Sequence, residues 1–149
     1  TADLAVTANI PESYVASSEQ RMDLYRRIAL IRTEADADDV LDELIDRFGE
    51  PPDSVTALVR VALLRGEAGR AGITDISQKA GALRFTLSAF DMRRVSELYA
   101  RPEFKGRLRV EAGSVPRISL KLPPKSRVLD EASRFAAAWA ETDKYSQED

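Results

Sequence analysis

Residues 39–52 constrain the fold more than any other stretch of this chain. They read Asp-Val-Leu-Asp-Glu-Leu-Ile-Asp-Arg-Phe-Gly-Glu-Pro-Pro. Gly49 suits the left-handed residue that ends a helix, and Pro51 and Pro52 prevent that helix from continuing. The stretch therefore predicts a helix, a sharp corner and a new helix that begins at Pro52. The apolar residues recur at the spacing of a helix that buries one side, and they are Val40, Leu41, Leu44, Ile45 and Phe48.

The other side of this predicted helix is acidic. It carries Asp39, Asp42, Glu43 and Asp46, and residues 34–56 contain nine acidic residues and one basic residue. A solvated surface tolerates such a cluster, and Lys or Arg side chains of a binding partner would neutralise it. Both interpretations stay open. Catalysis by paired carboxylates is disfavoured, because an exposed helix face offers no burial that would separate their pKa values.

The remaining chain predicts helices first and strands later. Helices are expected over 17–33, from an Asp36 cap through Phe48, over 52–71, over 91–99 and from residue 128 to the end of an ordered domain at residue 141. Strands are expected over 4–8, 73–77, 83–87, 108–110 and 118–122. This segregation predicts an α+β fold: a short N-terminal strand and three helices, then a small, largely antiparallel sheet with two further helices.

Two glycines interrupt the third predicted helix. Gly66 and Gly69 each cost about 1 kcal/mol relative to Ala inside a helix. We therefore expect either close packing at these positions or a frayed last turn.

Several classes of site are disfavoured by composition. The chain has no Cys and no His, which removes the commonest metal ligands and nucleophile-base pairs. It also lacks the GxxxxGK[ST], GxGxxG, GxSxG and HExxH motifs. We expect no catalytic residue, no cofactor and no metal, and no membrane contact. The expected organisation is a single domain, 1–141, cut from a larger protein, with a disordered tail over 142–149.

Basic residues concentrate in the second half of the chain. Residues 57–128 contain fifteen basic and six acidic residues. The candidates for nucleic-acid contact lie on or beside predicted strands, and they are Arg84, Arg107, Arg109 and Lys121. A strand surface with cations and aromatics can hold single-stranded nucleic acid. Phe85, however, is in phase with Leu83 and Leu87 and is expected to face the core, so a solvated sheet face explains the same pattern.

The sequence resembles the C-terminal domain of bacterial transcription-repair coupling factors. The resemblance rests on Glu43-Leu44-Ile45-Asp46-Arg47-Phe48-Gly49 with Pro52, and covers roughly residues 4–110. Further matches in the same order are Ile10-Pro11, Tyr14-Val15, Gln20-Arg21, Leu24-Tyr25-Arg26-Arg27-Ile28-Ala29 and Gly72-Ile73.

This resemblance implies a function that no single motif states. In the family, the full-length protein is a cytoplasmic, DNA-dependent ATPase and translocase that acts on stalled RNA polymerase and recruits the excision-repair protein UvrA. Its motor lies outside this domain. The C-terminal domain packs on a UvrB-like N-terminal module of the same polypeptide and masks the surface that UvrA recognises. The resemblance implies that Glu43 and Asp46 meet basic residues of that module. The alternative is an accessory nucleic-acid-binding domain that uses the basic region 79–127.

Overall fold

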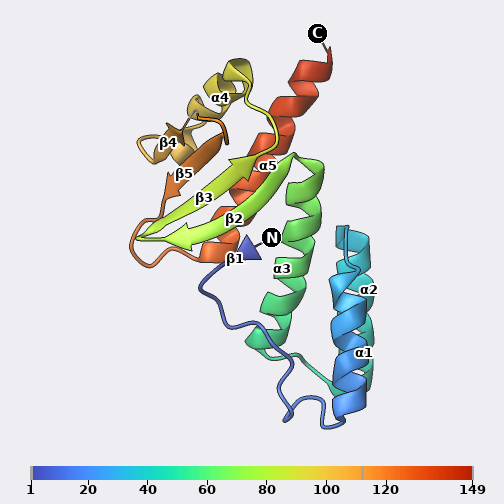
Figure 1. The fold of residues 1–149 in the computed structure, drawn as a ribbon. Helices are drawn as coiled ribbons and strands as arrows, with labels where there is room; N and C mark the ends of the chain where they lie inside the picture. Colours follow the sequence, from blue (N-terminus) through green and yellow to red (C-terminus); the bar gives the residue numbers. More distant parts are fainter. Residues whose placement is uncertain (1, 112, 149) are drawn as a thin grey trace. The chain divides into compact units, whose positions relative to one another are not determined.

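The order of helices and strands follows the expectation from the sequence. The structure is a computed structural model that describes residues 2–111 and 113–148. Its elements are β1 (Ala2–Asp3), α1 (Ser18–Ala29), α2 (Glu34–Phe48), α3 (Asp53–Arg70), β2 (Ile73–Lys79), β3 (Ala82–Leu87), α4 (Met92–Tyr99), the 3-10 helix η1 (Pro102–Phe104), β4 (Leu108–Glu111), β5 (Arg117–Lys121) and α5 (Val128–Glu148) (Figure 1). The prediction of an α+β fold is confirmed.

The chain forms two compact units. The helical unit comprises residues 6–67, and the sheet unit comprises residues 1–5 and 68–149. Helix α3 begins in the helical unit and its last residues belong to the sheet unit. The single domain over 1–141 stays a prediction.

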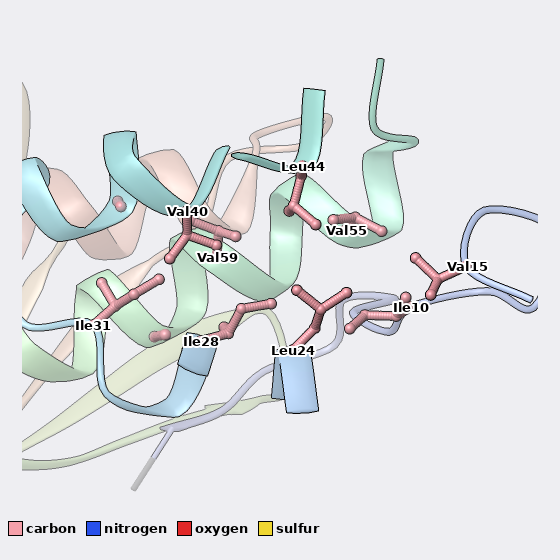
Figure 2. Close-up of a cluster of buried hydrophobic side chains, with 11 residues drawn as sticks. Ile10, Val15, Leu24, Ile28, Ile31, Val40, Leu44, Val55 and Val59 are labelled. Atoms are coloured by element: carbon pink, nitrogen blue, oxygen red, sulfur yellow. The ribbon is translucent and has the colours of Figure 1, made fainter. Parts of the chain in front are cut away.

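Burial of apolar side chains from α1, α2, α3 and the preceding segment holds the helical unit together (Figure 2). Thr33 rather than Asp36 caps α2: the Thr33 side chain accepts from the backbone N–H of Asp36, and the Asp36 carboxylate accepts from the backbone N–H of Thr33. This reciprocal pair satisfies two donors that the first turn leaves open. The buried cluster consists of Ile10, Val15, Leu24, Ile28, Ile31, Ala37, Val40, Leu44, Val55, Val59 and Ala62.

Close packing at Gly66 explains one of the two helix glycines. A Cβ at Gly66 would lie 2.8 Å from the backbone oxygen of Arg32 and 2.9 Å from its Cα. The connection between α1 and α2 therefore passes against α3 at a distance that only glycine permits. A Cβ at Gly69 would meet no atom within 4 Å. The expected packing is present at Gly66, and Gly69 lies within α3, one residue before the helix ends.

The sheet unit contains a five-stranded sheet in the order β1-β2-β3-β5-β4. All pairs are antiparallel except β1 with β2, which are parallel. Ala80 and Gly81 connect β2 to β3 with φ values of 51° and 76°, as a tight hairpin turn with two positive φ angles requires. The N-terminal strand lies at Ala2–Asp3 and not at residues 4–8, because only this segment pairs with Ile76 and Ser77.

One face of this sheet is covered by α5. Leu83, Phe85 and Leu87 alternate onto the buried face, and the Phe85 ring stacks on Phe135 of α5 with centroids 3.8 Å apart. In Figure 1, α5 passes behind β2 and β3. The opposite face, which we call the open sheet face, carries the residues of β2–β5 that alternate with these buried ones. The expectation that Phe85 faces the core is confirmed.

Helix α5 extends past residue 141. The guanidinium of Arg94 lies 4.0 Å from the ring centre of Trp139, donates to the Trp139 carbonyl oxygen and donates from Nε to the hydroxyl of Thr142. Thr142 is buried. Helix α5 therefore includes residues beyond the expected domain boundary, the disordered tail over 142–149 stays a prediction, and residue 149 lies outside the described residues.

Candidate interaction faces on helix α2 and on the sheet

The outer side of α2 is set by the burial of its inner side. Ala37, Val40 and Leu44 are buried, while Leu41 and Phe48 pack against the same cluster as half-buried residues. This arrangement turns the intervening positions toward solvent. The prediction that all five apolar residues of the stripe face the core is wrong for Ile45, which is 44% exposed.

Three of the four predicted carboxylates lie on this outer side and have no partner among the residues that the structure describes. Asp39, Asp42 and Asp46 are exposed, and none of them makes an ion pair or side-chain hydrogen bond with another residue that the structure describes. We call these three residues the acidic face of α2. Ile45 lies between Asp42 and Asp46 on the helix, so the acidic face also contains an accessible apolar side chain.

Glu43 differs from the other three carboxylates. Its Oε2 accepts from Nη1 of Arg27 on α1 and, at 3.2 Å, from Nη1 of Arg47 one turn along α2. The hydrogen bond from Arg27 is the main reason that the pKa of the Glu43 carboxyl lies below its usual value, and the charges of Arg27 and Arg47 act in the same direction. Contact between Glu43 and another module stays a prediction, and a partner's cation would have to replace the counter-charge that Arg27 of α1 already supplies.

The corner after α2 is held by a tyrosine from the N-terminal segment. The Tyr14 hydroxyl donates to the carbonyl oxygen of Gly49 at 2.7 Å and lies 3.2 Å from that of Leu44. Its ring packs beside Phe48 with centroids 5.8 Å apart. Gly49 has the expected positive φ, 85°, but its ψ of −171° differs from that of the predicted left-handed residue. Burial raises the pKa of Tyr14, and the nearby Glu50 adds to that shift. These contacts fix where α2 ends.

A shallow hollow of about 210 Å³ lies beside the first turns of α2. Its polar groups are Arg27, Asp36 and Asp39, with Leu30, Ile31 and Val40 forming the apolar wall. Asp36 already accepts from the backbone N–H groups of Arg32 and Thr33, which lowers its pKa. Since Arg27 binds Glu43, Asp39 is the polar side chain of this hollow that remains open to a partner within the described helices.

The four basic candidates do not share one environment. Arg84, Arg109 and Lys121 lie on the open sheet face, with Arg84 and Arg109 both aligned with Ser119 of the strand between them. Arg107 points elsewhere. It donates to the carbonyl oxygens of Lys121 and Glu103 and, at 2.6 Å, to the carboxylate of Glu131, whose side chain is 8% exposed. Arg107 therefore joins β5 and η1 to α5 with each of its three guanidinium nitrogens donating, and its contact with nucleic acid stays a prediction.

Two further cations lie on the open sheet face: Arg117, which the sequence also places beside a predicted strand, and Lys79, which was not predicted there. Arg117 and Lys79 stand on the same side as Arg84, because their partners across the strands are Thr86 and Ala82. The signal was present for Arg117, since Arg117-Ile118-Ser119-Leu120-Lys121 alternates and places Arg117 in phase with Lys121. The strand expected over 73–77 ends before Lys79, whereas β2 continues through that residue.

Comparison with known proteins identifies the family of the chain. Residues 4–98 match the TRCF domain family. This chain belongs to that family. It is 35% identical over 86 residues to the transcription-repair-coupling factor of Bacillus subtilis, covering 58% of this chain and 7% of the relative. The corresponding protein of Mycobacterium tuberculosis is 39% identical over 80 residues, covering 54% of this chain and 6% of the relative. That of Escherichia coli is 33% identical over 85 residues, covering 56% and 7%.

The TRCF fold extends beyond the matched residues. A crystal structure of the C-terminal domain of a transcription-repair coupling factor matches with a TM-score of 0.85 at 18% identity, and the match covers 97% of this chain and 94% of that one. At this identity the likeness concerns the fold alone. The chain spans less than a tenth of the length of the curated relatives it matches, and the match assigns it to the TRCF domain rather than to a motor domain.

Metal-binding clusters and membrane-spanning helices are both absent from the residues that the structure describes. Within 2–111 and 113–148, no group of three or more acidic side chains is arranged to hold a metal ion. Over the same ranges, no helix is both long enough and apolar enough to cross a membrane.

Proposed function

We propose that this TRCF domain is a regulatory, autoinhibitory interaction domain of a transcription-coupled repair translocase. In this proposal the acidic face of α2 docks on basic residues of a UvrB-like N-terminal module of the same polypeptide and masks the surface that UvrA recognises. The full-length protein would be a cytoplasmic, DNA-dependent ATPase that acts on stalled RNA polymerase. Family membership supports this role. The observation that carries it is that Asp39, Asp42 and Asp46 are exposed and unpaired among the described residues.

The physical character of the acidic face suits a contact that must be released. Ion pairs at the rim of an interface contribute about 0–1 kcal/mol each and weaken as salt rises. Three such carboxylates therefore provide specificity and fast association without holding the domain permanently. Ile45 supplies the apolar contact that interfaces usually place inside a polar rim.

Glu43 receives a different role in this proposal. It joins α1 to α2 through Arg27, and so it positions the helix that carries the acidic face. Arg27 and Arg47 also place two positive charges beside Glu43, which lowers the attraction of a partner's cation at that point. We therefore assign docking to Asp39, Asp42 and Asp46, with Ile45, and assign Glu43 to support.

A binding experiment with the isolated N-terminal module tests this assignment. The double substitution Asp42→Asn with Asp46→Asn is expected to weaken binding of the 149-residue chain about five- to tenfold at low salt, because it removes two rim charges. In the full-length protein, the same change is expected to increase UvrA binding. Titration calorimetry at two salt concentrations measures the first effect, and UvrA pull-down measures the second.

A matched control separates docking from general charge. Glu12→Gln with Asp23→Asn removes two exposed carboxylates that lie outside α2. This control is expected to leave both measurements unchanged. Equal binding by the α2 double variant and the unsubstituted chain would remove the acidic face from the proposal, and UvrA access that is unaffected by that variant would remove autoinhibition.

The apolar residue beside the acidic face, Ile45, allows a second binding test. Ile45→Ala is expected to weaken binding to the module with little loss of stability, because Ile45 is 44% exposed in the helical unit. If binding is retained while the aspartate variant loses it, the contact is purely electrostatic and Ile45 lies outside it.

A further inference from the structure

The open sheet face gathers cations from four neighbouring strands. Lys79 belongs to β2, Arg84 to β3, Arg117 and Lys121 to β5, and Arg109 to β4. Their positions alternate with the buried residues of the same strands, so all five project from the face opposite α5. The acidic residues aligned on this face are Asp75 and Glu111, together with Asp3 of β1, which is aligned with Ser77. The face therefore has an excess of two positive charges, although the whole chain has a net charge of −3.

Small residues separate these cations in the direction across the strands. One row reads Asp3, Ser77, Arg84, Ser119 and Arg109, and the next reads Lys79, Ala82 and Lys121. Since adjacent strands lie about 4.8 Å apart, the backbones of Arg84 and Arg109 are separated by roughly 10 Å. Direct like-charge contact across strands, which is destabilising, is thus avoided. The arrangement leaves a shallow surface of cations with hydroxyl groups between them.

We propose that the open sheet face binds the phosphate backbone of duplex DNA without regard to base sequence. Lys and Arg side chains, together with Ser and Thr hydroxyls, are the groups that proteins commonly use to contact phosphate oxygens. Arg84, Arg109, Arg117 and Lys121 supply the charges, with Lys79 at the end of the hairpin. Ser77, Ser119 and Thr86 supply hydroxyl donors between them.

The composition of the face favours a duplex over a single strand. Proteins that bind single-stranded nucleic acid stack its bases on aromatic side chains. The aromatic residue of strands β2–β5 is Phe85, and it lies on the buried face against Phe135. A flat sheet also presents no helix that could enter the major groove to read bases. The surface therefore suits the regularly spaced phosphates of a duplex. It suits neither the stacking of unpaired bases nor the recognition of base edges in the major groove.

The ion pair on this face does not prevent such binding. Arg84 and Glu111 lie 3.3 Å apart, and their side chains are 44% and 36% exposed. Exposed pairs of this kind contribute little and rearrange easily. Arg84 can therefore exchange Glu111 for a phosphate oxygen. Arg107, in contrast, is held by Glu131 and two carbonyl oxygens and takes no part.

The expected salt dependence follows from the number of phosphates neutralised. Three phosphate contacts on B-DNA give a slope of about −2.7 in log affinity against log salt. Raising monovalent salt from 50 to 200 mM would then weaken binding roughly 40-fold. Binding should be equal for duplexes of different sequence.

Fluorescence polarisation with labelled 20-base-pair duplexes tests the proposal. The 149-residue chain is compared with Arg109→Gln combined with Lys121→Gln, which removes two cations of the open sheet face. We expect this variant to weaken binding about tenfold or more at 50 mM salt and to reduce the salt slope by about two. The control is Arg26→Gln combined with Arg65→Gln, which removes two exposed cations of the helical unit. We expect this control to keep the slope of the unsubstituted chain, and urea unfolding confirms that each variant is folded.

Each other outcome overturns the proposal. Absence of binding at 50 mM salt would show that the face is only solvated. Equal losses of affinity in the two double variants would show that long-range charge alone attracts DNA. Tighter binding to a single strand of the same length would assign a different ligand. Concentration-dependent dimers in sedimentation, lost in the Arg109 and Lys121 variant without any DNA binding, would assign the face to the acidic surface of a second copy.

Discussion

The helical unit and the sheet unit each carry a surface of one dominant charge, and in each unit a charged side chain near that surface is paired within the same unit. In the helical unit this residue is Glu43, whose side chain is 36% exposed where it meets Arg27. In the sheet unit it is Arg107, which is 20% exposed and meets a carboxylate of Glu131 that is 8% exposed. The two contacts have the same chemistry but differ in their access to water.

This difference in exposure decides which charge a partner can displace. Water and salt screen the Glu43 pairs, so their loss is inexpensive and a competing cation could replace Arg27. Removal of Arg107 leaves a carboxylate buried without its principal counter-charge, which costs far more than the pair itself contributes. Charged residues that look equivalent in sequence therefore divide into exchangeable and fixed groups.

The largest expected effect comes from the fixed group. Arg107→Ala should lower the free energy of unfolding by about 3 kcal/mol, because Glu131 then stays buried with a longer contact to Arg134 only. The control is Arg109→Ala, two residues along and exposed, which should change stability by about 0.5 kcal/mol or less. Urea denaturation measures both. Similar losses for the two variants would contradict the distinction between fixed and exchangeable cations.

A smaller effect is expected from the two glycines of α3. Gly66→Ala should destabilise the protein by about 2 kcal/mol, because the new methyl group would overlap the backbone of Arg32. Gly69→Ala should stabilise it by up to about 1 kcal/mol, since Ala is the better helix former and the site is open. Thermal unfolding distinguishes opposite signs directly. A gain at both positions would show that the connection between α1 and α2 can move away from α3.

The exchangeable group should give a still smaller change in stability. Glu43→Gln is expected to lower the urea midpoint slightly, and the loss should shrink at 0.5 M salt because the pairs with Arg27 and Arg47 are exposed. Asp46→Asn should leave the midpoint unchanged, since its carboxylate makes no ion pair within the described residues. A loss for Glu43→Gln that matches that of Arg107→Ala would remove the contrast between the two units.

The pH dependence of stability sharpens the same comparison. The pKa values of Glu43 and Asp36 lie below their usual values because of hydrogen bonds from Arg27 and from the backbone N–H groups of Arg32 and Thr33, respectively. The unfolded chain therefore takes up protons at these groups before the folded chain does. Their stabilisation is present above the ordinary carboxylate range and is lost as pH falls from that range through the lowered pKa values of the folded chain. Glu43→Gln should flatten the dependence of stability on pH, and an unchanged dependence would contradict the assignment.

Much of the fold was determined by local patterns in the sequence. Period-3.6 apolar spacing identified α2, the Gly49 and Pro51-Pro52 sequence identified its end, and period-two alternation identified β3 and β5. These signals are local because side chains along a helix or strand repeat on one face at a fixed period. The backbone N–H and C=O groups of each segment must also find hydrogen-bond partners, which restricts it to regular conformations. The prediction that Asp36 caps α2 was wrong, because both side chains suit a cap and the observed box uses Thr33 as the cap with Asp36 three residues later.

The availability of each charged side chain was decided by the tertiary structure alone. Periodicity placed Glu43 beside Asp42 and Asp46, but Glu43 forms an ion pair with Arg27 of α1. Spacing placed Arg107 beside Arg109, but Arg107 forms an ion pair with the buried Glu131 of α5. The physical reason is that a counter-charge far along the sequence comes within hydrogen-bonding distance only after folding. Sequence determined which residues carry charge and which helix or strand holds them. Folding determined which of those charges remain for a partner.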